Sequence, residues 1–230
     1  MKKISFVLHA VCLLIICLNA HASGGKEIAG WKAGVAHVMI TPQESMWMAG
    51  YASRDHPSEG KIQDLWAKAL ALEDANGKRC ILITTDLCAI PKDFSDRIRD
   101  QLKINNNLSR DQIIINCSHT HSGPVIENSL TNIYPLDEAQ GKKIKKYTEE
   151  LEKKIVALAA SAFKSMEPVE VFSENGLARF QVNRRNNNEP SLLFQEELKG
   201  PNDYAVPVIK VINKTGSIIA IAFGYACHNT

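Results

Sequence analysis

The sequence has 230 residues, in which 27 lysine or arginine residues nearly balance 25 aspartate or glutamate residues. Its apolar content of 45% can form one substantial hydrophobic core, so we expect one domain or most of one. The weak charge excludes nucleic acid as a bulk electrostatic partner, because proteins that bind it carry a clear positive excess.

The first 22 residues have the three parts of an export signal. Residues 1–3 form a basic start, residues 4–18 are apolar apart from two positions, and residues 20–22 read Ala-His-Ala, which suits signal peptidase. The apolar run is shorter than the roughly 20 residues of a membrane-spanning helix. We expect cleavage after Ala22 and a secreted or periplasmic mature chain over residues 23–230, with no transmembrane segment and equal numbers of basic and acidic residues.

Strand-like and helix-like segments follow one another in mixed order. Hydrophobic patterning predicts strands at residues 34–40, 67–74, 79–86, 112–117, 169–172, 206–212 and 218–227. Helical spacing predicts helices at residues 92–104 and 138–164, the second ended by Pro168. Asn76-Gly77 predicts a hairpin turn. The last strand is almost wholly apolar, which favours a central position with both faces buried. We predict an α/β fold with a mixed β-sheet core flanked by helices.

Four cysteines lie beyond the export signal: Cys80, Cys88, Cys117 and Cys227. They are too sparse for a disulfide scaffold, and no CxxC spacing indicates a structural zinc site. We expect small buried thiols in apolar strands.

Two histidines follow the strand predicted at residues 112–117, in the stretch Ser-His-Thr-His-Ser-Gly-Pro at residues 118–124. Ligands bind at the carboxyl edge of α/β sheets. In an extended backbone, His119 and His121 share one face, so that one can bind a metal while the other exchanges protons with a substrate. The alternative is a pair of histidines that only cap the strand through hydrogen bonds.

His228 favours the metal site. The strand predicted at residues 218–227 leads directly to it, so that a distant segment supplies a third imidazole from a strand end. Imidazoles from separate strands are what a catalytic zinc site requires. Asp86, which also ends a predicted strand, either orients a zinc-bound histidine or caps the following helix, and the structural role is favoured slightly.

Several stretches, taken in chain order, resemble the neutral (alkaline, non-lysosomal) ceramidases. The most specific is the stretch at residues 118–124. The others are residues 33–36 with 40–42, 49–51, 64–70, 85–87, 183–185, 200–203 and 225–228. The resemblance extends over nearly all of the mature chain.

The resemblance implies a role for each matching residue. His119 and His228 resemble the zinc ligands, His121 resembles the unligated histidine that hydrogen-bonds the reacting group, and Arg184 resembles the arginine that faces the developing oxyanion. Zinc lowers the pKa of bound water to about 7, and cationic side chains stabilise a tetrahedral oxyanion. The implied reaction is hydrolysis of the N-acyl amide bond of ceramide to sphingosine and fatty acid, with peripheral contact to membrane lipid.

The family completes its zinc shell with a glutamate and a tyrosine from later segments, and this sequence ends at Thr230. We therefore expect residues 23–230 to be the N-terminal portion of a ceramidase-like catalytic domain, with little activity of its own. The alternatives are an exported metallohydrolase of the same fold that acts on another amide or ester, and a non-catalytic lipid-binding remnant.

Overall fold

The computed structural model describes residues 28–188 and 198–228, so the predicted export signal at residues 1–22 lies outside the described residues. The described strands form one seven-stranded sheet in the order β4-β3-β2-β1-β5-β6-β7. Only β3 and β4 are parallel, and all other neighbours are antiparallel. The strands are β1 (Ile28–Met39), β2 (Trp66–Glu73), β3 (Arg79–Thr85), β4 (Ile113–Cys117), β5 (Glu167–Leu177), β6 (Ala205–Asn213) and β7 (Ile218–Phe223).

Two helices and two short 3-10 turns complete the described elements. They are α2 (Lys92–Asn106), η1 (Arg110–Gln112), η2 (Thr131–Ile133) and α3 (Glu138–Lys164). The predicted α/β class with a mixed sheet is confirmed. The predicted hairpin is also confirmed, because Gly77 has a φ of 77° and its amide donates to the Asp74 carbonyl between β2 and β3.

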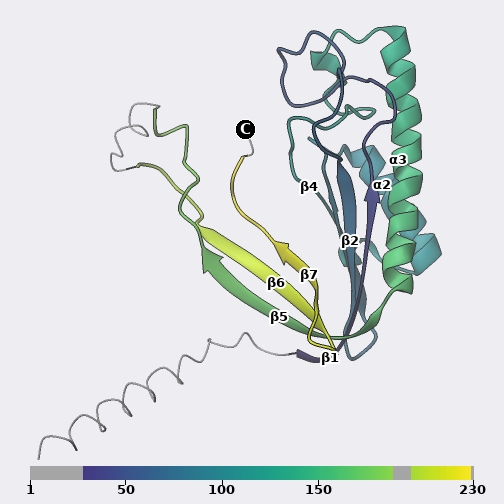
Figure 1. Ribbon diagram of the computed structural model, residues 1–230, viewed down its shortest axis with the longest axis vertical. Coiled ribbons are helices and arrows are strands. Elements are labelled where there is room, and N and C mark those ends of the chain that lie inside the picture. Colours follow the sequence, from purple (N-terminus) through teal and green to yellow (C-terminus); the bar gives the residue numbers. More distant parts are fainter. Residues whose placement is uncertain (1–27, 189–197, 229–230) are drawn as a thin grey trace, which may run out of the picture.

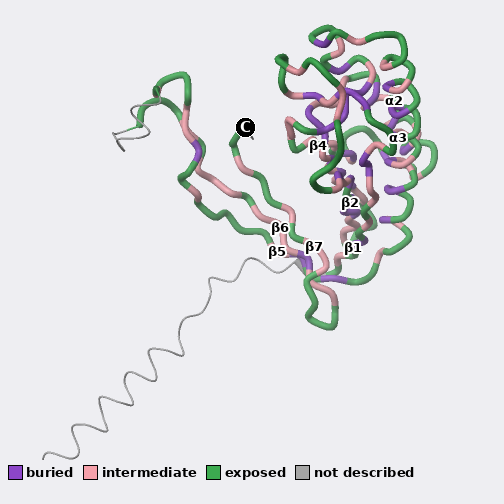
Figure 2. The backbone as a smooth tube through the Cα atoms, turned by 45° about the horizontal axis from the view of Figure 1, so that its top comes forward, coloured by how far each residue is buried: buried purple, intermediate pink, exposed green. Residues whose placement is uncertain are grey.

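Both helices cover the same face of the β1–β4 part of the sheet (Figure 1). Asp137 caps the N-terminus of helix α3, and its carboxylate accepts a hydrogen bond from the Gln140 amide at 2.7 Å. Its buried side chains recur at helical spacing and join the main core: Ile144, Leu151, Ile155, Leu158 and Ala162. Figure 2 shows the buried backbone gathered in this half of the molecule.

The sheet bends where β1 passes from β2 to β5. The β1–β5 pairing shifts register between Ile28 and Trp31, beside Gly30 with a φ of 88°. The result is two wings, one of β1–β4 with the helices and one of β5–β7 (Figure 1). A smaller apolar cluster that includes Ala33, Val169 and Val211 lies at the bend. Because of the bend, the wing of β5–β7 turns back toward the end of β4.

The last strand differs from the prediction in length and in place. β7 ends at Phe223 and lies at the edge of the sheet, and Ile218, Ile221 and Phe223 are exposed. The predicted central, doubly buried strand at residues 218–227 is therefore wrong. An apolar run shows which side chains prefer burial, but the neighbours that bury them come from the tertiary arrangement.

The packing of β1 on α3 requires a glycine at position 34. A Cβ atom there would lie 2.0 Å from the Ala162 carbonyl oxygen and 2.9 Å from the Met166 amide nitrogen, both in backbone. We expect Gly34→Ala to lower the free energy of unfolding by about 3 kcal/mol, since overpacking that backbone cannot relieve is costly. Urea denaturation measures the change.

Gly141→Ala is the control for this substitution. Gly141 lies within α3 and its added Cβ would meet no atom within 4 Å. Alanine there should be neutral or stabilise the chain by up to about 1 kcal/mol. If Gly34→Ala unfolds at the same urea concentration as the unsubstituted chain, the close approach of β1 to α3 is refuted.

Candidate active site

The turn that carries His119 and His121 begins where β4 ends. Ser118 continues the parallel ladder by donating its amide to the Thr85 carbonyl at 2.9 Å. The next residue leaves the extended conformation, because His119 has a φ of 57°. The condition of an extended backbone, under which the two histidines would share one face, is therefore not met. The left-handed residue turns the chain sharply, and the two imidazoles still meet, with ring centroids 4.9 Å apart.

His228 joins these two rings from the other wing. After β7, residues 224–228 run without regular structure toward the end of β4 (Figure 1). The His228 ring centroid lies 4.7 Å from that of His119 and 5.0 Å from that of His121. Its Nε2 lies 3.1 Å from His121 Nε2. The three predicted histidines thus form one cluster, although His228 comes from an irregular segment rather than from a strand end.

Tyr225 anchors the segment that carries His228. Its hydroxyl lies 2.9 Å from the Ala178 carbonyl oxygen and 2.7 Å from Gln181 Oε1. Its ring packs on that of Phe180 with centroids 4.6 Å apart. Gln181 is buried in turn. These contacts fix the path of residues 224–228 against the segment that follows β5.

Arg184 lies in the connection between β5 and β6, close enough to the cluster to act on it through charge. The pKa of His228 is lowered, first by loss of solvation and then by electrostatic interaction with His119, Arg184 and His121. The Asn183 side chain holds the backbone beside Arg184, since its Oδ1 accepts from the Arg185 amide at 3.1 Å. The predicted arginine is exposed, and its charge acts on His228.

His119 is oriented by a backbone carbonyl. Its Nδ1 lies 2.6 Å from the Cys88 carbonyl oxygen, so this nitrogen carries the proton and donates it. In the neutral form of the ring, the other nitrogen, Nε2, then has the lone pair that a metal ion needs. A carbonyl that fixes the tautomer in this way is the usual outer partner of a metal-binding histidine.

The Cys88 thiol lies beside the same ring. One donor atom from each of Cys88, His119 and His121 can be chosen so that all lie within 4.8 Å of one another, and Sγ lies 3.7 Å from His119 Nδ1. Burial raises the pKa of the Cys88 thiol, which keeps it protonated. Because His119 Nδ1 is also committed to the carbonyl, we favour a metal position on the Nε2 side, away from the thiol.

The cysteines differ from one another in burial. Cys88 is buried, Cys80 and Cys117 are half-buried, and Cys227 is exposed, and all four are free thiols. The prediction of buried thiols is therefore wrong for Cys227, because the chain beyond Phe223 leaves the sheet.

Asp86 connects the end of β3 to neighbouring segments. Its Oδ2 accepts from the Trp66 amide at 2.8 Å, and its Oδ1 lies 3.5 Å from the Ser118 hydroxyl. Helix α2 begins after Pro91, so Asp86 does not cap it. The capping alternative is wrong, and Asp86 instead supports the backbone from which the histidine turn starts.

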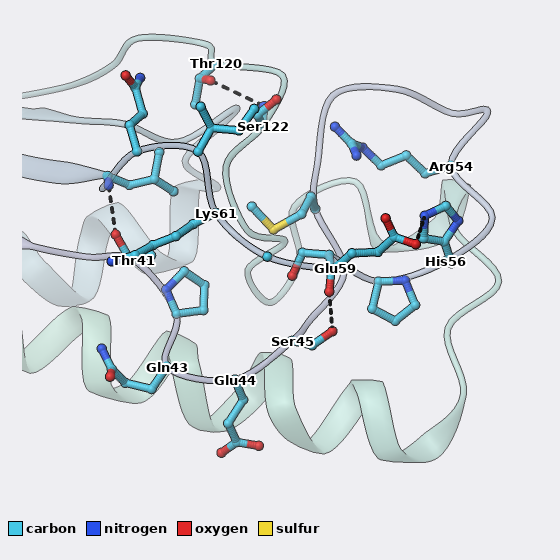
Figure 3. Close-up of a pocket in the computed structure, with 18 of the residues that line it drawn as sticks. Thr41, Gln43, Glu44, Ser45, Arg54, His56, Glu59, Lys61, Thr120 and Ser122 are labelled. Carbon is cyan, nitrogen blue, oxygen red and sulfur yellow. Dashed lines mark hydrogen bonds and ion pairs between the residues drawn. The ribbon is translucent and has the colours of Figure 1, made fainter.

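A pocket of about 1230 Å³ lies on the other side of the histidine turn, against the loop that follows β1. Thr120, Ser122, Arg54 and Lys61 are among the residues that line it (Figure 3). Lys61 is paired with Asp64 at 2.6 Å, so this charge is neutralised locally. Alternate residues of the turn thus lie in different environments. His119 and His121 contact His228, whereas Thr120 and Ser122 line the pocket.

Residues 31–230 match the family described as neutral/alkaline non-lysosomal ceramidase, N-terminal. The chain belongs to this family. It is 25% identical over 195 residues to neutral ceramidase B of Dictyostelium discoideum, covering 80% of this chain and 26% of that protein.

Two solved ceramidase structures share the fold. The crystal structure of neutral ceramidase from Pseudomonas aeruginosa matches with a TM-score of 0.69 and 21% identity over 87% of this chain and 32% of the other. A ceramidase complexed with C2 matches with a TM-score of 0.68 and 21% identity over 87% and 31%. The chain thus spans about a quarter to a third of the length of these ceramidases.

Cys88, His119 and His121 of this ceramidase-family chain form a group that could hold a metal ion, and His228 lies beside it. His121 Nδ1 is buried and has no hydrogen-bond partner in the described residues, so the cluster is not a satisfied structural network. The separation of 3.1 Å between His121 Nε2 and His228 Nε2 suits one shared proton. The same separation is close to the spacing of about 3.3 Å between two nitrogens bound tetrahedrally at about 2.0 Å from one ion, an arrangement that would make His121 a ligand rather than the unligated histidine that the resemblance implies. Neutral imidazoles are preferred zinc ligands.

Tyr51, Arg54 and Cys88 contact the histidines, yet sequence reasoning gave them no role in the site. Tyr51 belongs to a stretch that resembles the family, whereas Arg54 and the Cys88 carbonyl are marked by no pattern.

Within residues 28–188 and 198–228, no helix has both the length and the apolar character needed to cross a membrane.

Proposed function

We propose that this chain is part of a zinc-dependent amidohydrolase that cleaves the N-acyl amide bond of ceramide, or of a closely related N-acyl lipid. One observation carries the proposal: the rings of His119, His121 and His228 converge to within 5.0 Å in a chain that matches the ceramidase family over residues 31–230. The related proteins are ceramidases, which supports ceramide as the substrate.

His119 and His228 would hold the zinc ion, each through a neutral imidazole. The Cys88 carbonyl keeps the His119 proton on Nδ1, which leaves Nε2 for the ion. The lowered pKa of His228 has the same effect, because it favours the neutral ring. When bound, zinc acidifies water and polarises the scissile carbonyl.

His121 and Arg184 act on the substrate directly in this proposal. The His121 ring exchanges protons with the substrate. It holds one proton toward the reacting carbonyl group and delivers one to the departing amine. Arg184 supplies positive charge where negative charge develops on the carbonyl oxygen. The overall reaction consumes one water and yields sphingosine and a fatty acid.

We also propose that the protein is exported, on the pattern of residues 1–22, and meets its lipid substrate at a membrane surface without spanning it. This location agrees with a substrate that resides in membranes. Fractionation of cells that express the complete open reading frame tests it, and retention in the cytoplasm would contradict it.

The test of function uses the protein encoded by the complete open reading frame that contains this chain. We expect zinc-dependent release of sphingosine from ceramide, loss of that release on chelation, and recovery when zinc is restored. His121→Ala should lower kcat by about 10²- to 10⁴-fold, the usual contribution of a general acid–base group. It should leave zinc bound.

Two other outcomes would replace the proposal. Turnover of short acyl amides or esters without turnover of ceramide would keep the metallohydrolase and change its substrate. Association with ceramide vesicles that persists after chelation, with no turnover of any substrate, would identify a lipid-binding protein instead.

A further inference from the structure

A short segment after β1 contacts His121 from three sides. The segment comprises residues 50–54, and it folds back on itself through a hydrogen bond from the Arg54 amide to the Tyr51 carbonyl at 3.3 Å. Gly50, Tyr51 and Arg54 each contact a different part of His121: its backbone, its ring and its carbonyl.

Gly50 packs against the backbone side of His121. A Cβ atom at Gly50 would lie 2.4 Å from His121 Cα and 2.5 Å from His121 Cβ. The Gly50 amide donates to the Tyr134 hydroxyl at 2.9 Å, and Tyr134 is buried. The core therefore fixes Gly50, and Gly50 in turn limits where His121 can lie.

Tyr51 contacts the imidazole itself. The two rings meet edge to face with centroids 4.9 Å apart at an angle of 74°. Tyr51 is 45% exposed, so it contributes little to the core and its main contact within the site is the His121 ring.

Arg54 completes the set with a hydrogen bond to the backbone. Its Nη2 donates to the His121 carbonyl at 2.7 Å, and its guanidinium lies 5.5 Å from the centroid of the Tyr51 ring. Its Nε is buried without a partner. Within the described residues Arg54 makes no ion pair, unlike Arg97, which bonds to Glu152. The strong donor of Arg54 is therefore directed to His121 rather than to an acidic side chain.

We propose that Arg54 is a positioning residue, which acts together with the ring of Tyr51 and holds His121 in place beside His228. The guanidinium fixes the His121 carbonyl and stacks on Tyr51, while Tyr51 limits rotation of the His121 ring. The chemical value of that position rests on the proposed function, in which His121 exchanges protons with the substrate.

The test follows the His121 ring by ¹⁵N NMR in the chain labelled at histidine, with the His121 signals identified by their loss in His121→Ala. Arg54→Gln should shift or broaden the His121 ring signals and leave those of His37 and His56 unchanged. Arg79→Gln is the matched control. Arg79 also donates to one backbone carbonyl, that of Asn106 at 2.9 Å, and stacks over one ring, that of Phe163 at 5.4 Å, but at the opposite end of β3.

The proposal is overturned if Arg54→Gln leaves the His121 signals as they are in the unsubstituted chain, or if Arg79→Gln changes them equally. A second pair of variants covers the case in which Arg54→Gln does not fold. Tyr51→Leu removes the ring contact and should move the His121 signals, whereas Tyr51→Phe keeps the ring and should not. Equal spectra for these two variants would also overturn it.

These measurements need no turnover, so they separate the positioning role from the proposed reaction. If ceramide is not hydrolysed while the His121 signals respond as expected, the proposed function fails and the positioning role stands. In the active complete enzyme, Arg54→Gln should lower kcat by at least 10-fold with little change in KM, because misplacement of a reacting group by about 1 Å costs on the order of 100-fold.

Discussion

His119→Ala is expected to reduce the zinc affinity of the chain by more than 100-fold. The Cys88 carbonyl lies 2.6 Å from His119 Nδ1 and holds the ring proton there, so Nε2 would be the nitrogen that binds the ion. Loss of an outer hydrogen-bonding partner of a ligand costs about 10- to 100-fold in affinity, so loss of the ligand itself should cost more. Titration with zinc against a competing chelator measures the change.

Substitutions of the other cluster members test which nitrogens bind the ion. We expect His228→Ala to match His119→Ala, and His121→Ala to retain zinc affinity within about 10-fold, as an outer residue would. Cys88→Ser should also retain it, since the Cys88 contact with His119 that matters is made by a backbone carbonyl. His37→Ala is the control, because His37 lies on β1 and contacts Trp66 rather than the cluster.

Each result bears on a specific assignment. If His121→Ala removes zinc as completely as His228→Ala, the separation of 3.1 Å between their Nε2 atoms reflects two ligands of one ion rather than a hydrogen bond. If Cys88→Ser removes it, the metal lies on the thiol side of His119. Unchanged affinity in His119→Ala would eliminate the proposed zinc site.

Elements whose local and tertiary preferences agree could be predicted from the sequence. Residues 138–164 form α3 with the predicted bounds, because its apolar stripe, its Asp137 cap and its contact with the sheet all favour the same helix. The β2–β3 hairpin was predictable for the same reason, since Asn76-Gly77 specifies the turn directly.

Strand ends that depend on distant partners could not be predicted. β5 extends to Leu177 through polar residues such as Glu174, because β6 pairs with it along that length. Conversely, β7 stops at Phe223 although the sequence remains apolar. In both cases the backbone partner, rather than the side chain pattern, sets the limit of the strand.

The candidate site divides in a similar way. Its three histidines were predictable as chemical groups, and their convergence follows from the bend in the sheet, which no local pattern indicates. His119 has a left-handed backbone conformation. The contact of its ring with Cys88 and the contact of Arg54 with His121 both use a backbone carbonyl, which every residue has. Sequence reasoning therefore finds the reactive side chains and misses the contacts that orient them.

Gly50→Ala is expected to disturb the site more than any other single methyl addition beside it. Gly50 has a φ of 116°, and its new Cβ would lie 2.4–2.7 Å from three atoms of His121. Strained backbone and overpacking each cost about 1–3 kcal/mol, so we expect a total near 4 kcal/mol in the free energy of unfolding. His121 must also move, which should lower kcat in the complete enzyme by about 100-fold.

Gly77→Ala separates the two causes. Gly77 also has a positive φ, 77°, but its added Cβ would meet no atom within 4 Å. This variant should lose only the backbone contribution of about 1–2 kcal/mol and keep normal kcat and His121 NMR signals. If Gly50→Ala and Gly77→Ala behave alike in denaturation and in the His121 signals, the contact between Gly50 and His121 does not position the histidine. A larger loss in Gly50→Ala, with altered His121 signals, would show that residue 50 must be glycine because a Cβ atom there would collide with His121 in the histidine turn.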